Sequence, residues 1–286
     1  NNTTIVQMGE QSPDKLISYV RKRLQNFHPH AVRRVEIPKP DGRLRPLGIP
    51  TIEDRIIQQC IKQVLEPICE AKFYKHSYGF RPNRSAHHAI ARAMYLANQS
   101  DFRFVVDVDI KGFFDNVNHG KLLKQLWTLG IQDKQVLRVL SKMLKAPIAG
   151  VGIPEKGVPQ GGILSPLLAN VVLNELDWWI SNQWETFQSR KQYSGSSEQY
   201  RALRNTNLKK VFIVRYADDF KLFCKTRSEA ERIYIAVKNW LMERLGLEIS
   251  PEKSKIVNLK KRWSDFLGFK LRLRPKSGKW VIKSQM

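Results

Sequence analysis

Hydrophobic residues recur along this chain with two different periods. Several segments repeat apolar residues every three or four positions, which is the spacing of an amphipathic helix. They are 14–27, 51–68, 85–98, 118–128, 133–145, 165–184 and 228–245. Other segments are rich in β-branched and aromatic residues and predict strands, namely 102–110, 211–215, 220–224 and the stretch after 264. The pattern therefore predicts a mixed α+β protein.

The order of these elements narrows the fold further. From residue 102 onward the predicted order is strand, helix, hairpin, helix, strand, which is that of a ferredoxin-like βαββαβ sheet. Before it, segment 32–50 places β-forming residues around a PDG turn and predicts a basic hairpin among helices. Segment 188–210 is polar, basic and poor in aliphatic residues, so we expect a mobile inserted loop.

Acidic and apolar residues alternate in segment 102–110. The apolar side chains fall on one face of the predicted strand, and Asp107 and Asp109 fall on the other. We therefore expect a half-buried strand whose acids lie on an open face.

The composition indicates which kind of partner the protein binds. The chain has 286 residues, enough for two packed subdomains, and its 49 Lys and Arg against 26 Asp and Glu give a net charge of +23. The excess is spread along the chain, so a nucleic acid is the expected partner. Its 3 cysteines are too few and scattered for a disulfide framework or a zinc site, which fits a reducing cytosol. No run approaches the ~18 apolar residues of a membrane span, so we expect no membrane partner.

Two adjacent acids stand out in so basic a chain. Asp218 and Asp219 in RYADDF (215–220) lie between the β-forming runs VFIV and KLFC. An exposed turn is one explanation, because Asp favours turns. However, Asp109 ends another strand of the same predicted sheet, and three carboxylates at one sheet end require a cation. Two Mg²⁺ ions roughly 3.5–4 Å apart would hold the attacking and leaving oxygens of a phosphoryl transfer. Spacing alone does not separate Asp107 from Asp109 as the third ligand.

Six motifs occur in an order that resembles one family. They are GFRPNRSAHHA (79–89), DVDIKGFFDNV (107–117), GVPQGGILSPLLANVVLNEL (157–176), RYADDF (215–220), EKSKI (252–256) and FLGF (266–269). This order resembles the reverse transcriptase of bacterial group II intron maturases. The resemblance implies a right-handed polymerase that copies intron RNA into DNA and binds intron RNA to assist splicing and mobility.

The resemblance also implies a division of the chain. Residues 1–100 correspond to helical, RNA-contacting fingers, and residues 101–286 to the palm. The palm would include a glycine-rich loop near 150–162, the insertion 188–210 and a primer-grip hairpin near 264–286. The family's chain continues into a helical thumb, whereas this one stops at Met286, so we expect the thumb to be absent.

The resemblance assigns catalytic and metal-binding roles to Asp109, which precedes IKGFF, and to Asp218 and Asp219. Asp107 is the alternative ligand. Two Mg²⁺ ions are the implied cofactors, with Mn²⁺ as a substitute.

Other positions match substrate-binding motifs of the family. The nucleotide-binding set comprises Lys39 and Arg45 on the basic hairpin, Phe114 against the ribose 2′-hydroxyl, Gln160 and Lys255. The expected template and primer contacts are Arg81, Arg84, Gly161, Gly162, Leu267 and Gly268. The two glycines of PQGG would let backbone approach closely, and Leu267 and Gly268 form the tip of FLGF.

The implied partners are group II intron RNA, an RNA template with a DNA primer, and deoxynucleoside triphosphates, and a homodimer is left open. The expected location is the bacterial cytoplasm, in a ribonucleoprotein with intron RNA. Two alternatives stay open at this point. One is an RNA-binding splicing module with secondary polymerase activity, and the other is a retron or CRISPR-associated reverse transcriptase.

Overall fold

The computed structural model describes residues 4–38, 42, 44–100, 102–277 and 279–285. The chain forms two compact units, and each combines two separate stretches of sequence. The first unit is Asn1–Phe73 with Gly112–Val172, and the second is Tyr74–Lys111 with Leu173–Met286. The units therefore differ from the expected division after residue 100, because helix and strand segments from both sides of that point pack together in each unit.

The first unit is mainly helical, with one hairpin. Its elements are α1 (Ile5–Gly9), α2 (Pro13–Gln25), β1 (Arg33–Pro38), β2 (Leu44–Ile49), α3 (Ile52–Glu70), α5 (Phe113–Asn116), α6 (His119–Thr128), α7 (Lys134–Leu144) and the start of α8 (Ser165–Ser181). Strands β1 and β2 pair in antiparallel register from Arg33 opposite Ile49 to Pro38 opposite Leu44, which confirms the hairpin predicted from segment 32–50.

Side-chain caps set the starts of α3 and α7. The Thr51 hydroxyl accepts a hydrogen bond from the backbone N–H of Asp54, and Asp133 Oδ1 accepts from Gln135 and Val136. Helix α3 confirms the amphipathic helix predicted for 51–68, and its Ile57, Ile61 and Leu65 form a buried apolar stripe.

Val64 belongs to the same helix, but its surface is 62% exposed. At 100° per residue it lies at the edge of the face that the three buried residues define, and no apolar surface covers it.

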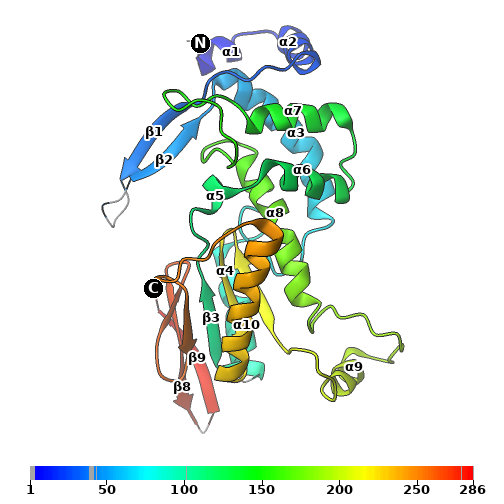
Figure 1. The fold of residues 1–286 in the computed structure, drawn as a ribbon, viewed down its shortest axis with the longest axis vertical. Coiled ribbons are helices and arrows are strands. Elements are labelled where there is room, and N and C mark those ends of the chain that lie inside the picture. Colours follow the sequence, from blue (N-terminus) through cyan, green and yellow to red (C-terminus); the bar gives the residue numbers. More distant parts are fainter. Residues whose placement is uncertain (1–3, 39–41, 43, 101, 278, 286) are drawn as a thin grey trace. The chain divides into compact units, whose positions relative to one another are not determined.

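The second unit holds the sheets. Its elements are α4 (Ala86–Ser100), β3 (Phe104–Val108), the end of α8, α9 (Ser196–Leu203), β4 (Phe212–Tyr216), β5 (Asp219–Cys224), α10 (Arg227–Trp240), the π-helical turn η1 (Leu241–Leu245), β6 (Lys255–Asn258), β7 (Ser264–Phe266), β8 (Phe269–Lys276) and β9 (Lys279–Gln285). Figure 1 labels most of them along the chain.

Two sheets form within this unit. Strands β4, β5, β3 and β6 lie in that order and pair antiparallel throughout. This is the strand order of a ferredoxin-like βαββαβ sheet, as the sequence predicts. Strands β7, β8 and β9 make a separate antiparallel sheet.

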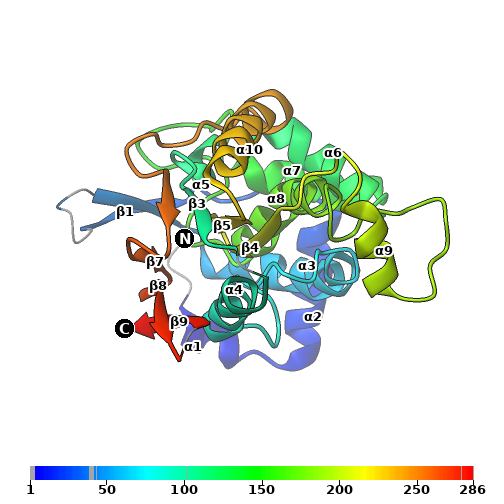
Figure 2. The same ribbon diagram turned by 90° about the horizontal axis from the view of Figure 1, so that it is seen from below.

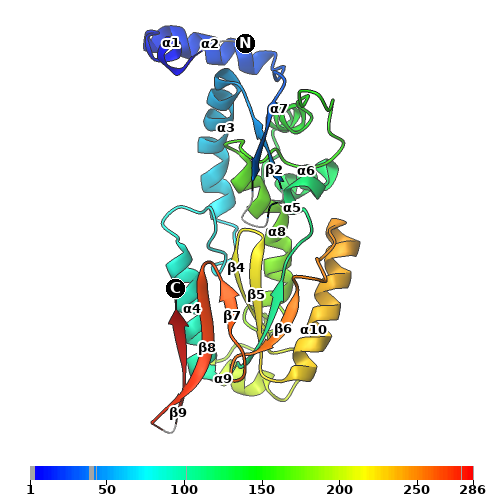
Figure 3. The ribbon, with the colours of Figure 1, turned by 90° about the vertical axis from the view of Figure 1, so that its left-hand side faces the viewer.

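Both faces of the four-stranded sheet are covered. Helix α10 packs on β3, β5 and β6, while α4 packs on β4 and on β8 and β9 (Figure 2). Figure 3 shows the same arrangement, with α4 and α10 on either side of the strands. Leu96 of α4, Val105 of β3 and Phe223 of β5 belong to one buried cluster with Leu271 of β8.

This covering corrects the expectation of an open acidic face on β3. Asp107 is buried, with 9% of its surface exposed, because side chains from β7 and α4 close over that face. Segment 188–210 is also more structured than a loop, since it contains α9, whose Leu203 is buried and whose Tyr200 stacks on Trp184. No helix among the described residues has the length and apolarity needed to cross a membrane.

Candidate active site

The adjacent acids lie at a strained hairpin tip. Tyr216 pairs with Asp219 across β4 and β5, so Ala217 and Asp218 form a two-residue turn. Ala217 has a φ of 57°, a left-handed conformation that non-glycine residues rarely adopt. Arg215 Nη1 donates a 2.8 Å hydrogen bond to the Ala217 carbonyl oxygen and helps hold the turn.

Arg215 is itself held by a buried acid. Its Nε and Nη2 donate to the two carboxylate oxygens of Asp177 at 2.8 and 2.6 Å, and both side chains are almost fully buried. A bidentate pair of this kind fixes the guanidinium plane. The turn is therefore anchored through Arg215 to α8.

The segment just before Gly79 runs beside β4. Ser77 pairs in parallel with Arg215, the Tyr78 N–H donates to the Arg215 carbonyl at 2.8 Å, and the Arg215 N–H donates to the His76 carbonyl at 3.2 Å. A Cβ atom on Gly79 would lie 2.2 Å from the Ala217 nitrogen. The glycine that opens GFRPNR is thus required by the backbone of the acidic turn.

The acids at this end of the sheet repel one another. Burial raises the pKa of Asp219 to about 6, Lys221 opposes the shift, and the carboxylates of Asp107, Asp218 and Asp109 add to it. Asp219 is nevertheless exposed at the protein surface, so its carboxylate is accessible to solvent and only partly shielded by the surrounding residues. No hydrogen bond or ion pair engages its carboxylate within the described residues.

Asp109 follows β3 at the same end. Its backbone N–H donates to Ser254 Oγ at 3.1 Å, and Lys253 Nζ lies 3.3 Å from its Oδ2. Both partners belong to EKSKI, which the sequence analysis singled out only for Lys255. Lys255 is exposed and lies opposite Asp107 across β3 and β6, so it too lies near the acids.

Asp107 has a different environment from Asp109. Lys221 Nζ donates to its Oδ1 at 2.5 Å, and Ser264 Oγ lies 3.1 Å from both carboxylate oxygens. Lys221 is also buried and lies opposite Asp107 in the sheet. The structure thus places Asp107 in a buried ion pair and leaves Asp109 at the surface. Lys221 was missed from sequence, although a lysine at an apolar position of a predicted strand signals a buried partner.

The FLGF turn lies close by. Leu267 and Gly268 have φ values of 53° and 82°, the left-handed pair of a type I′ hairpin turn between β7 and β8. Phe266 is buried, and Lys221 Nζ lies 5.1 Å from the centre of its ring.

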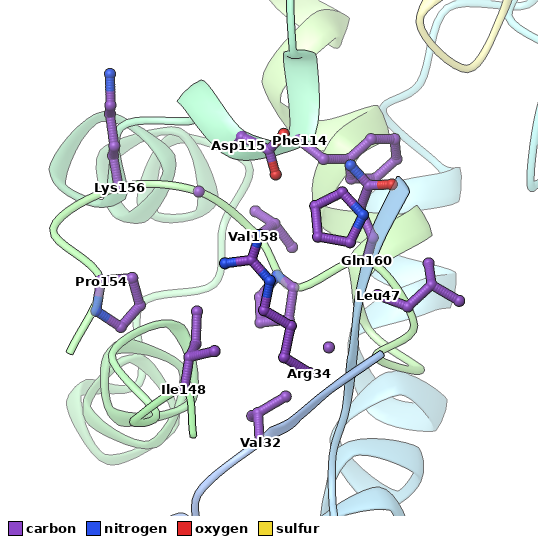
Figure 4. A pocket seen from close by; sticks show the side chains of 14 residues that line it. Val32, Arg34, Leu47, Phe114, Asp115, Ile148, Pro154, Lys156, Val158 and Gln160 are labelled. Carbon is purple, nitrogen blue, oxygen red and sulfur yellow. The ribbon is translucent and has the colours of Figure 1, made fainter. Parts of the chain in front are cut away.

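Phe114 and Gln160 lie in the first unit, around a cavity of about 210 Å³ (Figure 4). Phe114 is buried in α5 and packs edge to face with Phe113 at 5.3 Å between ring centres. Figure 4 shows Arg34 of β1 reaching between Ile148 and Val158 toward this cavity. Arg34 was not singled out by the sequence analysis, because it resembles the other basic residues of the hairpin.

The two PQGG glycines serve contacts inside the first unit. Gly161 has a φ of 114°, and a Cβ atom there would lie 2.8 Å from the carbonyl oxygen of Gly48. A Cβ atom on Gly162 would lie 2.8 Å from Ser165 Oγ. Gly161 thus allows the Gly48 backbone to approach closely, and Gly162 leaves room for a side chain, while the expected nucleic-acid contacts of both glycines stay predictions.

Arg81 and Arg84 differ in exposure. Arg81 is buried and donates to the carbonyl oxygens of Tyr74 and Ser77 at 2.7 and 2.9 Å. Its guanidinium is thus shielded, which corrects the expectation that it touches a template. Arg84 is partly exposed, donates to the Lys75 carbonyl and lies over the Tyr78 ring. Lys39 and the side chain of Arg45 lie outside the described part of the chain.

A family model settles the class of protein. The model for reverse transcriptase (RNA-dependent DNA polymerase) matches residues 37–271, most of the chain. The chain belongs to the reverse transcriptase family. Reverse transcriptases are RNA-directed DNA polymerases, and the family implies an RNA template and divalent metal ions.

Related proteins agree with this assignment. The chain is 36% identical over 275 residues to protein YkfC of Escherichia coli, covering 91% of this chain and 71% of YkfC. It is 33% identical over 291 residues to the group II intron-encoded protein LtrA of Lactococcus lactis, covering 87% of this chain and 48% of LtrA. The chain therefore spans about half the length of LtrA.

The fold also resembles telomerase. The structure of apo telomerase from Candida tropicalis aligns with a TM-score of 0.61 over 94% of this chain and 59% of that one, at 15% identity. An identity this low supports the reverse transcriptase fold and nothing finer.

The acids fit the divalent metal that a reverse transcriptase uses. Carboxylate oxygens are the preferred ligands of Mg²⁺, and Asp219 is crowded by like charges that a cation would neutralise. In the part of the chain that the structure describes, no three acidic, His or Cys side chains are already gathered as a metal cage.

Proposed function

We propose that this chain is the polymerase domain of a group II intron-encoded reverse transcriptase. Its similarity to LtrA supports the intron type, as does a 30% identity over 315 residues to the putative COX1/OXI3 intron 2 protein of Saccharomyces cerevisiae. The proposed reaction joins a deoxynucleoside triphosphate to a DNA primer on an RNA template. In the longer protein, the same surface would bind intron RNA and assist splicing and mobility.

The observation that carries this proposal is the acidic end of the four-stranded sheet. Asp109 follows β3, Asp218 and Asp219 lie at the tip of the β4–β5 hairpin, and the charges of Asp109 and Asp218 help to raise the pKa of Asp219. These three carboxylates would hold two Mg²⁺ ions, or Mn²⁺, which supply charge stabilisation to the attacking and leaving oxygens of the transfer. Asp107 is excluded from this set because Lys221 and Ser264 already occupy its carboxylate.

Basic side chains near the acids complete the proposed nucleotide site. Lys255 lies opposite Asp107, and its positive charge lowers the pKa of that carboxyl group. This cation therefore lies near the acidic end of the sheet, where it is proposed to attract the triphosphate. Lys39 and Arg45 on the hairpin are proposed to neutralise charge on the leaving pyrophosphate. Phe114 and Gln160 of the first unit are proposed to contact the sugar and base of the incoming nucleotide.

The proposed template and primer contacts are Arg84, the PQGG backbone at Gly161 and Gly162, and the FLGF tip at Leu267 and Gly268. The type I′ turn holds this tip rigidly, which suits a surface that must position a primer end. Intron RNA would be attracted by the net charge of +23, with the exposed basic side of α2 as one candidate surface. The proposed nucleotide and primer contacts all come from one chain, so they do not require a homodimer.

Primer extension tests the proposal directly. The assay uses an RNA template, a DNA primer, deoxynucleotides and Mg²⁺, with Asp218→Asn as the test variant. Glu231→Gln is the matched control, because Glu231 is an exposed acid of α10 whose partner among the described residues is Arg227 on the helix surface. We expect extension by the parent and the control but none by Asp218→Asn, with RNA binding retained in all three. Intact extension by Asp218→Asn would overturn the metal-site assignment.

Two outcomes separate the intron-specific part from the polymerase part. Tight binding of structured intron RNA by a parent protein that cannot extend a primer would favour the splicing-module alternative. For the sugar contact, Phe114→Ala should increase ribonucleotide incorporation, since it removes the ring proposed to exclude the 2′-hydroxyl. Unchanged discrimination would remove Phe114 from the site.

A further inference from the structure

A second cavity lies at the far end of the palm-like sheet in the second unit. Its volume is about 690 Å³, and Cys224, the last residue of β5, is part of its wall. Asp219 begins the same strand of 6 residues, so at about 3.4 Å per residue the two ends are about 17 Å apart. Figure 3 shows α9 at this end of the sheet, away from the turn that joins β4 to β5. The cavity is therefore distinct from the acidic site.

The cavity has an apolar floor and a cationic rim. Buried side chains of Trp184, Val211 and Ile233 form the floor. The rim carries basic residues from the segment before β4 and from the start of α10, namely Arg204, Lys209, Lys210, Lys225 and Arg232. This combination suits a ligand with one apolar part and one strongly anionic part.

The rim cations are not neutralised by protein carboxylates. None of the five forms an ion pair within the described residues. Glu229 is the one acid among the lining residues, and its Oε2 accepts hydrogen bonds from the backbone N–H groups of Lys225 and Thr226 at 3.1 Å each. It is thus used as the helix cap of α10 rather than as a counter-charge.

Two of the lysines are gathered against aromatic rings. Lys210 Nζ lies 5.2 Å from the centre of the Trp184 ring and 5.7 Å from that of Phe102, while Lys225 Nζ lies 5.7 Å from Phe102. Burial lowers the pKa of Lys210, and the charges of Lys225 and Arg204 lower it further. Cations held close together in a recess repel one another, and an anion that enters the recess relieves this repulsion.

We propose that this cavity is a second phosphate-binding site that holds one nucleotide of an RNA away from the polymerisation site. Lys210, Lys225 and Arg232 would hold the phosphate by charge-assisted hydrogen bonds, and the nucleoside would lie over the apolar floor. A volume of about 690 Å³ exceeds what a lone phosphate needs. RNA is the favoured source because the chain is a reverse transcriptase with a net charge of +23. The inference goes beyond the proposed function, which needs no anchor at this end of the sheet.

RNA binding by a charge-removing variant tests the site. Lys210→Gln/Arg232→Gln removes two rim cations, and Arg227→Gln/Lys238→Gln is the matched control, with two exposed cations of α10 that do not line the cavity. Affinity for a single-stranded RNA is measured from 50 to 200 mM salt. The rim variant should lower the slope of log K against log salt by about 0.7, the value for the one phosphate that these cations are proposed to hold. Equal losses in both variants would show general charge attraction and overturn the proposal.

A lysine footprint identifies the source of the phosphate. Acetylation of Lys210 and Lys225 is followed by mass spectrometry with the RNA, with uridine 5′-monophosphate or with inorganic phosphate present, and Lys238 serves as the internal reference. Selective protection by RNA at concentrations where the two small anions give none supports the proposal. Protection by the small anions alone would make this a small-phosphate site and overturn the RNA assignment. The footprint contains no primer or deoxynucleotide, so a failure of the proposed polymerase function would leave its result unchanged.

Discussion

Gly79 and Ala217 approach so closely that a Cβ atom on Gly79 would lie 2.2 Å from the Ala217 backbone nitrogen. Ala217 in turn has a left-handed φ of 57° in the turn that carries Asp218. The two motifs GFRPNR and RYADDF, which are far apart in the sequence, are thus one structural unit. The first positions the backbone of the second.

We expect Gly79→Ala to displace the acidic turn. A real Cβ atom needs the turn backbone to move, at a cost of about 1–3 kcal/mol in the free energy of unfolding. Primer extension should fall far more than RNA binding does. Gly195→Ala is the control, because a Cβ atom there meets nothing within 4 Å. Full polymerase activity in Gly79→Ala would show that the turn tolerates the displacement.

Metal binding should depend on pH through Asp219. The pKa of its carboxyl group is about 6, above the usual 3.8, so the folded protein binds this proton more tightly than the unfolded chain does. The ionised Asp219 carboxylate therefore destabilises the folded protein fully above pH 6. This destabilisation is lost as the pH falls through 6 and the group binds its proton. Thermal stabilisation by Mg²⁺ should be clear at pH 7.5 and should disappear below about pH 6. Stabilisation that persists unchanged at pH 5 would contradict this assignment.

Asp219→Asn should separate stability from activity. Removing one charge from a crowded acidic cluster should raise the metal-free Tm by roughly 1–3 °C, since functional sites often trade stability for activity. Primer extension should fall by about a thousandfold or more, because metal charge stabilisation is worth several kcal/mol. Differential scanning calorimetry without metal gives the first value. A lower Tm would mean that the carboxylate makes favourable contacts instead.

Asp107 and Asp109 should respond to substitution in opposite ways. Asp107→Asn leaves the buried Lys221 without its counter-charge and should cost about 3–5 kcal/mol in urea unfolding, while Mg²⁺ stabilisation persists. Asp109→Asn loses only an exposed contact with Lys253, so stability should change little, but Mg²⁺ stabilisation should vanish. The reverse result would make Asp107 the metal ligand.

Arg81 and Arg84 provide a further matched pair. Arg81→Gln removes two hydrogen bonds to the carbonyl oxygens of Tyr74 and Ser77, so it should lower Tm without a specific change in template affinity. Arg84→Gln should weaken template binding several-fold with a small change in Tm, because its side chain is partly exposed. Affinity is compared at equal folded fraction. A specific affinity loss in Arg81→Gln would restore it as a template contact.

Much of the fold could be predicted from the sequence, because local signals specify it. The helix over 51–68, the basic hairpin of 32–50 and the strand within 102–110 each depend on neighbours within a few residues. The order of strands in the palm-like sheet also followed, since few topologies connect such a series. The exposure of Val64 and the presence of helix α9 could not be predicted from the sequence. Each depends on whether residues distant in the sequence cover an apolar side chain.

By itself, the sequence determined the reverse transcriptase family and the α+β class and singled out the acidic residues proposed to hold metal, because these depend on residue types in a fixed order. Only the tertiary structure distinguishes the surroundings of Asp107 from those of Asp109, since period 2 places both on one face, and the difference depends on Lys221 and Ser264 arriving from other strands. It likewise decided that Arg81 is a buried structural residue and that Gly79 serves the acidic turn. Burial and partners come from segments far apart in the chain, and no local pattern encodes them.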